Sequence, residues 1–343
     1  MKTKSINFPF KRWLVMMALA LTATTLAIAV PAVNSQSKPI VKVDGSSTVY
    51  PITEAVAEDF QAARQGAVQV TVGVSGTGGG FKKFCAGETD ISNASRPIKA
   101  EEQKACQAAG ISYIELPIAY DALTVVVNQQ NNWAGSMTVA ELKKMWEPAA
   151  QGKITKWNQV RSGWPDAPLK LYGPGADSGT FDYFTEAIVG ESKQSRTDYL
   201  PSEDDNVLVQ GVSRDKNALG YFGYAYYEAN KGKLKAVGID GGKGAVMPSK
   251  ATVENGTYQP LSRPIFIYVS TKANQRAEVK QFVEYYLSNA AKLSAEVSYV
   301  PLPARAYQMV TNNYKSNKTG SVFTGRETVG VKIEELLQLE ARQ

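Results

Sequence analysis

Short polar stretches rich in hydroxyls and glycine hold the side chains of this sequence that are best suited to binding chemistry. Three of them are Asp44–Val49 (DGSSTV), Ser75–Gly80 (SGTGGG) and Asp177–Thr180 (DSGT). Hydroxyls and backbone N–H groups are hydrogen-bond donors, and glycine lets the backbone approach a ligand closely. Several donors directed at one point form a site for an anion. Each stretch by itself is also typical of a flexible turn or of a helix cap.

Each of these stretches lies between a predicted strand and a predicted helix. We expect strands over 40–43, 68–74 and 169–172, and helices that begin near Pro51, Phe81 and Phe181. Strands that alternate with helices indicate an α/β fold with a largely parallel sheet. Ligands bind such sheets beyond the carboxyl ends of the strands, where helix N-termini attract anions. The three stretches are therefore predicted to contribute to one anion site.

A fourth polar segment, Ser95-Arg96-Pro97-Ile98, follows a predicted strand over 90–94. Arginine can bind an oxyanion through two parallel hydrogen bonds, so Arg96 is a candidate clamp for the anion. The alternative is a solvated or ion-paired side chain on a loop. Separate strands are predicted further along, over 111–116 and 123–127.

Residues 1–35 are typical of a secretory signal peptide. A basic start, with Lys2, Lys4, Lys11 and Arg12, precedes an apolar run from Trp13 to Val30 and then small residues. The run could also be a marginal membrane anchor, but the small residues after it favour cleavage. Removing the four basic residues of this segment from the total of 38 leaves 34 basic against 32 acidic residues, with no basic run. The composition therefore predicts no nucleic-acid partner.

The chain contains two cysteines, Cys85 and Cys106, and no histidine. In an exported protein an even cysteine count favours a disulfide, and two separate buried thiols are the alternative. The absence of histidine excludes Ser-His-Asp and Cys-His catalysis and removes the commonest ligand of transition metals. Neither a metal cluster nor a dinucleotide fingerprint is present in the sequence. These absences weaken most hydrolase interpretations, and we predict a protein that is not an enzyme and that has no cofactor.

Taken together, the four polar segments resemble the ligand loops of the phosphate-binding proteins of ABC-type phosphate importers. Asn217–Tyr221 (NALGY) resembles a further signature of that family, and the likeness covers most of residues 40–310. The resemblance implies a type II periplasmic binding protein, in which two α/β domains are joined by two hinge crossings around a cleft. Domain one would comprise 36–119 and 263–343, and domain two 120–262. The crossings would be Leu116–Asp121 and Ser262–Phe266.

The resemblance also implies a ligand, a location and partners. Inorganic phosphate would be bound in the periplasm by a monomer and delivered to ABC-transporter permease subunits. The phosphate donors carried over by motif are the hydroxyls of Thr48, Thr77, Ser178 and Thr180, the N–H groups of Val49 and Gly179, and Ser47 as a neighbouring candidate. A binder of another tetrahedral oxyanion (sulfate, arsenate or phosphonate), a secreted phosphatase and a module that reports to a sensor are the alternatives.

Two positions depart from the better-known branch of that family. Ser95 stands where the branch has an aspartate, and Pro174 stands where it has an arginine. We therefore predict that Arg96 supplies the positive charge and that Asp177 holds Arg96 in place. The acceptor for the proton of the phosphate is then unassigned, with Asp177 as a candidate. Without such an acceptor, the sequence leaves the discrimination between phosphate and sulfate open.

Overall fold

The computed structural model describes residues 38–324 and 329–342, so the predicted signal peptide of residues 1–35 lies outside the described residues. The strands are β1 Ile40–Gly45, β2 Gln69–Val72, β3 Ile91–Ala94, β4 Tyr113–Asn128, β5 Ser136–Thr138, β6 Lys170–Pro174, β7 Leu200–Ser202, β8 Ala218–Gly223, β9 Leu234–Ala236, β10 Gly238–Asp240, β11 Ala245–Val246, β12 Ser262–Ser270 and β13 Val300–Pro301. The helices are α1 Tyr50–Ala63, α2 Gly76–Cys85, α3 Ala100–Ala108, α4 Val139–Trp146, α5 Gly179–Phe184, α6 Asp205–Arg214, α7 Tyr224–Asn230, α8 Lys250–Glu254, α9 Ala277–Glu296, α10 Ala304–Lys315 and α11 Ile333–Arg342. Within these residues, no helix combines the length and the apolar character needed to cross a membrane.

The main sheet is mixed rather than largely parallel. Its principal strand order is β2-β1-β3-β12-β4-β8-β6-β7. β1 is parallel to β2 and β3, and β6 is parallel to β7 and β8. In the middle of the sheet, β12 is antiparallel to both β3 and β4, and β4 is antiparallel to β8, because the chain crosses from one parallel group to the other along β4 and comes back along β12. The α/β prediction is confirmed, and the prediction of a largely parallel sheet holds only toward the two ends.

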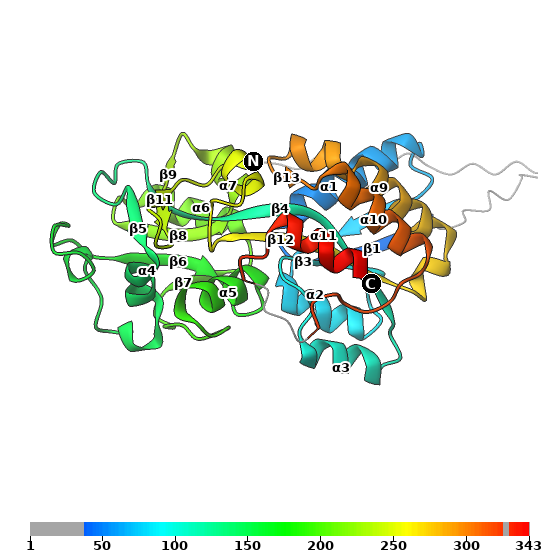
Figure 1. The fold of residues 1–343 in the computed structure, drawn as a ribbon, viewed down its shortest axis with the longest axis horizontal. Helices are drawn as coiled ribbons and strands as arrows, with labels where there is room; N and C mark the ends of the chain where they lie inside the picture. The colour runs from blue at the N-terminus through cyan, green and yellow to red at the C-terminus, as the bar shows by residue number, and fades with distance from the viewer. Residues whose placement is uncertain (1–37, 325–328, 343) are drawn as a thin grey trace, which may run out of the picture. The chain divides into compact units, whose positions relative to one another are not determined.

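β4 is one continuous strand of 16 residues, all of them buried, where the sequence predicted two separate strands. Its first part, as far as Ala122, pairs with β12, and its last part, from Leu123, pairs with β8. Figure 1 shows β4 and β12 running side by side between the two groups of strands. The predicted hinge crossings are therefore adjacent antiparallel segments, with Arg263 opposite Asp121. The predicted domain boundaries stay a prediction.

Helices hold the strand ends in place through buried apolar faces. On one side α1 packs against α9, where Phe60 meets Phe282 edge to edge with ring centroids 5.4 Å apart. On the other side Trp146 of α4 packs against Tyr221 of β8 at 4.9 Å. Burying a side chain of this size stabilises a fold by about 1.5–3 kcal/mol. The strands whose ends carry the polar turns are therefore packed against two hydrophobic cores, one that contains Phe60 and Phe282 and one that contains Trp146 and Tyr221.

A disulfide joins Cys85, the last residue of α2, to Cys106 in α3, with an S–S distance of 2.01 Å. The structure thus confirms the bridge and excludes the alternative of two separate thiols. It ties the far end of α2 to α3. α2 is the helix whose first turn contains Thr77.

We expect the double variant Cys85→Ser/Cys106→Ser to lose about 3 kcal/mol of unfolding free energy, because the bridge restricts the unfolded chain. Urea unfolding of the protein without residues 1–35 and of the same form of the variant measures this difference. A reducing agent should lower the midpoint of the wild type and leave that of the variant unchanged. Equal midpoints for wild type and variant would contradict the prediction.

Candidate functional site

Four buried hydroxyls from the polar turns form two pairs, which together we call the hydroxyl cluster: Thr48 with Thr180, and Thr77 with Ser95. Thr48 Oγ1 lies 3.0 Å from Thr180 Oγ1, although the two residues are 132 positions apart in the chain. Thr77 Oγ1 lies 3.2 Å from Ser95 Oγ and accepts a hydrogen bond from Ser95 N. The turns follow β1, β3 and β6 or begin α2, so the strand ends position them. The structure brings together the turns that the sequence singled out.

Gly179 brings the turn after β6 into contact with the pair formed by Thr77 and Ser95. A Cβ atom added to Gly179 would overlap Thr77 Oγ1 and lie 2.7 Å from Ser95 Oγ. Only a glycine therefore lets the backbone lie this close to the two hydroxyls. Gly179 is the first residue of α5, and Ser178 caps that helix by accepting a hydrogen bond from Thr180 N at 3.1 Å.

Arg263 of β12 is the cation of the hydroxyl cluster, and the sequence analysis missed it. Its side chain is 1% exposed. Its Nη2 donates to Thr180 Oγ1 at 2.8 Å and to Thr48 Oγ1 at 3.4 Å, and its Nη1 donates to the carbonyl of Gly179 at 3.3 Å. The signal that could have found it is a single charged residue inside the otherwise apolar strand Ser262–Ser270.

Asp121 of β4 is the carboxylate that balances Arg263. It lies opposite Arg263 in the sheet, and its Oδ2 accepts from Nη2 at 3.0 Å and from Nε at 3.3 Å. Both side chains are buried, and a buried charge is tolerated where it is paired and hydrogen-bonded. Hydroxyl donors, a guanidinium and a carboxylate acceptor are what an oxyanion that carries one proton requires.

Comparison with known proteins identifies the family of the chain. A family model described as a PBP superfamily domain matches residues 31–290. Protein SphX of Synechococcus elongatus is 56% identical over 331 residues, which are 96% of this chain and 97% of that protein. A phosphate-binding protein PstS of Staphylococcus saprophyticus is 41% identical, over 78% of this chain and 82% of that protein. The chain belongs to the phosphate-binding protein family.

Solved structures of this family show the same fold. A possible phosphate-binding protein from Planctomyces limnophilus is 48% identical, with a TM-score of 0.60, over 82% of this chain and 99% of that chain. A putative phosphate ABC transporter substrate-binding protein from Clostridium perfringens, solved with bound phosphate, is 27% identical, with a TM-score of 0.65, over 77% of this chain and all of that chain. The predicted periplasmic-binding-protein fold is confirmed.

The predicted pairing of Arg96 with Asp177 is wrong. The Asp177 carboxylate pairs with Lys82 at 2.8 Å, and both side chains are largely exposed. The main chain of Asp177 contacts the glycine turn, where its carbonyl accepts a hydrogen bond from Gly78 N at 2.7 Å. Arg96 is buried and pairs instead with Glu102 and Asp182. The reason is that α5 places Asp182, rather than Asp177, beside the Ser95 turn.

Two further predicted phosphate donors, Val49 and Ser47, lie beside the hydroxyl cluster. Val49 is buried and precedes the first residue of α1. Ser47 is also buried, and its carbonyl accepts a hydrogen bond from the Tyr226 hydroxyl at 2.9 Å. That contact joins the turn after β1 to α7. The roles of Ser47, Val49 and Ser178 toward an anion stay predictions.

A cavity of about 590 Å³ lies beside the turn that carries Ser47 and Thr48. Ser47 and Tyr50 line it from the turn after β1 and the start of α1, and Glu203 and Asp204 line it from the turn after β7. Ser47 directly precedes Thr48 in the chain, but none of the four residues of the hydroxyl cluster is among the described residues that line this cavity. Among the residues that the structure describes, no group of three or more histidine, cysteine or acidic side chains could hold a metal ion.

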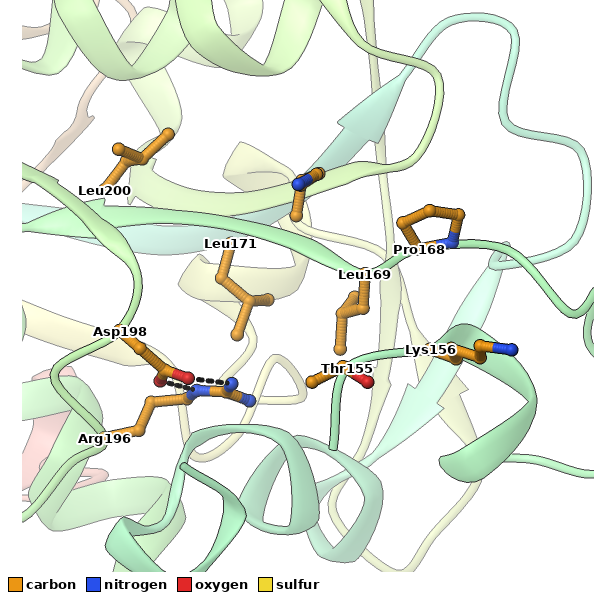
Figure 2. Close-up of a pocket in the computed structure, with 9 residues that line it drawn as sticks. Thr155, Lys156, Pro168, Leu169, Leu171, Arg196, Asp198 and Leu200 are labelled. Atoms are coloured by element: carbon orange, nitrogen blue, oxygen red, sulfur yellow. Dashed lines mark hydrogen bonds and ion pairs between the residues drawn. The ribbon is translucent and has the colours of Figure 1, made fainter. Parts of the chain in front are cut away.

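Figure 2 shows another cavity, of about 550 Å³, which lies at the start of β6 rather than at its end. Leu169 and Leu171 line it together with Arg196 and Asp198, whose ion pair is drawn as dashed lines. No predicted site residue is among the described residues that line it. The strand separates this cavity from the turn that reaches the hydroxyl cluster.

Asp205, the first residue of α6, has a buried carboxyl group that bonds to Ser47. It is 1% exposed, and within the described part of the chain its Oδ2 has no hydrogen-bond partner. The pKa of Asp205 is raised to about 8, mainly by burial and then by the charge of Asp121, while the charge of Arg263 and a hydrogen bond from Ser47 oppose the shift. The folded protein therefore holds a proton on Asp205 that the unfolded chain releases above about pH 4.

We expect Asp205→Asn to be more stable than the wild type at about pH 8, and we expect this gain in stability to be smaller at about pH 5. The folded state binds more protons than the unfolded state in this range, so the wild type loses stability as the pH rises. Thermal melting of both proteins at the two pH values measures the gap. A gap that does not grow with pH would contradict the assignment of a raised pKa to this carboxyl.

Proposed function

We propose that this chain binds inorganic phosphate at the hydroxyl cluster and delivers it to the permease of an ABC-type importer. The observation that carries the proposal is that buried hydroxyls from separate turns lie together, and that two of them, Thr48 and Thr180, bond to the buried Arg263. Such donors are fixed before the ligand arrives, so they stabilise an oxyanion at little cost of reorganisation. The names of the curated relatives, and the phosphate bound in the Clostridium perfringens protein, support the choice of ligand.

In this proposal Arg263 takes the part that the sequence assigned to Arg96. The hydroxyls of Thr48, Thr77, Ser95 and Thr180 donate to phosphate together with the N–H of Gly179. Asp121 is the proposed acceptor of the phosphate proton, in place of Asp177. This choice is supported by the burial of Asp121 and by its bond to Arg263. A buried acceptor favours a protonated phosphate over sulfate, which carries no proton at neutral pH.

Closure of residues 120–262 against the rest of the chain would exclude water from the bound anion. β4 and β12 form the two crossings between these parts, and their paired backbones would bend as a unit. The closed, loaded form is what a membrane permease would recognise. The family assignment and the sequence of residues 1–35 support an exported, periplasmic monomer that binds a solute and catalyses no reaction.

Isothermal calorimetry with phosphate and sulfate on the exported protein tests the function. We expect phosphate binding that sulfate in excess does not displace. No heat of binding at millimolar phosphate would reject the proposal, and tighter binding of sulfate would assign the site to that oxyanion. A chromogenic phosphate ester tests the phosphatase alternative, and we expect no turnover.

A further inference from the structure

Arg96 anchors a buried ion-pair network directly behind the hydroxyl cluster. Its guanidinium donates to both carboxylate oxygens of Glu102, at 2.8 and 2.7 Å, and to the carbonyl of Pro97 at 3.0 Å. Its remaining nitrogen, Nε, donates to Asp182 Oδ2 at 2.7 Å. These bonds engage all three nitrogens of the guanidinium. None of the hydrogen bonds found for Arg96 within the described residues goes to the hydroxyl cluster.

Asp182 is the carboxylate that accepts from both Arg96 and Lys99. It lies in α5, and its carboxylate is 1% exposed. Lys99 Nζ lies 3.2 Å from its Oδ1, and Ser192 Oγ lies 3.4 Å from the same oxygen. Lys99 also donates to Ser192 Oγ at 2.9 Å. Two cations that follow β3 therefore hold one carboxylate that follows β6.

The network joins the two segments that carry the hydroxyl cluster. Arg96 follows Ser95 in the chain, and Asp182 is two residues after Thr180. Glu102 fixes Arg96 from the first turn of α3, so the guanidinium is oriented before it meets Asp182. Burial alone would lower the pKa of Arg96, but the hydrogen bonds and charges of Glu102 and Asp182 hold it above its ordinary value. The pair therefore stays charged when the segments are together.

We propose that Arg96, Lys99 and Asp182 form a latch that holds the Ser95 turn against the Thr180 turn and sets the rate at which bound phosphate leaves. The inference rests on the proposed function. In the predicted domain division, Arg96 and Lys99 belong to domain one and Asp182 to domain two. Opening of the cleft would then pull the ions of the latch apart. Arg96 is thus a positioning residue that acts through Asp182, whereas Arg263 is the cation that touches the anion.

The test compares Arg96→Gln, Asp182→Asn and the double variant with the wild type, by calorimetry and by stopped-flow release of phosphate. Each single variant is expected to release phosphate at least about tenfold faster, with a nearly unchanged association rate, because losing one partner of a buried charge pair acts on dissociation. The double variant is expected to be no weaker than the weaker single variant. Such non-additivity is the signature of residues that act as a pair.

Two readouts separate a latch from a direct contact between Arg96 and the anion. If Arg96 bound phosphate itself, Asp182→Asn would free its Nε from a competing carboxylate and leave affinity unchanged or higher. The loss in Arg96→Gln would also grow with pH, because the dianion gains more from a cation than the monoanion does. The latch instead predicts that Asp182→Asn weakens binding, and that Arg96→Gln and wild type differ by the same factor at about pH 6 and about pH 8.

Arg161→Gln is the control for the loss of an ion pair as such. Arg161 forms bonds of 2.6 and 2.7 Å with Glu141, and both residues lie within 120–262. We expect this variant to keep the wild-type release rate. A wild type that binds no phosphate would overturn the proposed function itself. A wild type that binds phosphate, with release rates unchanged in Arg96→Gln and Asp182→Asn, would overturn the latch alone.

Discussion

Replacing Arg263 by glutamine is expected to lower the affinity for phosphate by about 100-fold or more. Truncating one partner of a buried, hydrogen-bonded charge pair costs about 2–5 kcal/mol. Arg263 bonds to two members of the hydroxyl cluster and is almost fully buried, so water cannot replace its charge. Isothermal calorimetry with phosphate, on the exported wild type and on the variant, measures the loss.

The same substitution leaves Asp121 as a buried carboxylate without its cation, and an unpaired buried charge destabilises a fold. The double variant Arg263→Gln/Asp121→Asn removes that stranded charge, and we expect it to recover stability without recovering phosphate binding. Arg196→Gln is the matched control, because Arg196 is also buried and paired with an aspartate, in the cavity of Figure 2. Its affinity for phosphate should equal that of the wild type. Wild-type affinity in Arg263→Gln would remove Arg263 from the site.

Replacing Gly179 by alanine is expected to cost about tenfold or more in phosphate affinity. The new methyl group would overlap Thr77 Oγ1 and press on Ser95 Oγ, so both hydroxyls would have to turn away from the cluster. Overpacking of this kind costs about 1–3 kcal/mol, and each 1.4 kcal/mol is about tenfold in affinity. The substitution also blocks the approach of the backbone N–H at the start of α5.

Gly232→Ala is the control for a glycine-to-alanine change by itself. No atom lies within 4 Å of a Cβ added at Gly232, and the backbone of Gly232 does not have the positive φ that would strain an alanine. We expect this variant to bind phosphate as the wild type does. If Gly179→Ala bound phosphate equally well, the turn at Gly179 would not be part of the ligand site. The melting temperature of each variant shows that it is folded before calorimetry.

The polar turns could be predicted from the sequence because each one is a local feature. A strand, a run of hydroxyls with glycine and the start of a helix lie within a few residues of one another, as at Thr77 or Thr180. Such patterns depend on backbone conformation and on hydrogen bonding between near neighbours. The rule that the carboxyl ends of parallel strands meet at one edge then placed the turns together.

The partners of the two arginines could not be predicted in this way. The departures from the family pattern at Ser95 and Pro174 led to the prediction that Asp177 holds Arg96, yet the structure pairs Arg96 with Asp182 and Glu102. The two aspartates are five positions apart, and which one meets Arg96 depends on how far α5 is rotated and inserted against the Ser95 turn. That placement is set by packing across the two halves of the sheet, which leaves no local trace in the sequence.

By itself, the sequence determined the polar turns, the strands and helices that flank them, and the hydroxyls that those turns present. Only the tertiary structure decided which cation completes the site. Arg263 and Asp121 are 142 positions apart and become neighbours through the antiparallel register of β12 on β4. A slip of one residue in that register would turn either side chain to the opposite face of the sheet. The register is set by the cumulative pairing of two buried strands, and a charge in an apolar run gives no indication of its partner.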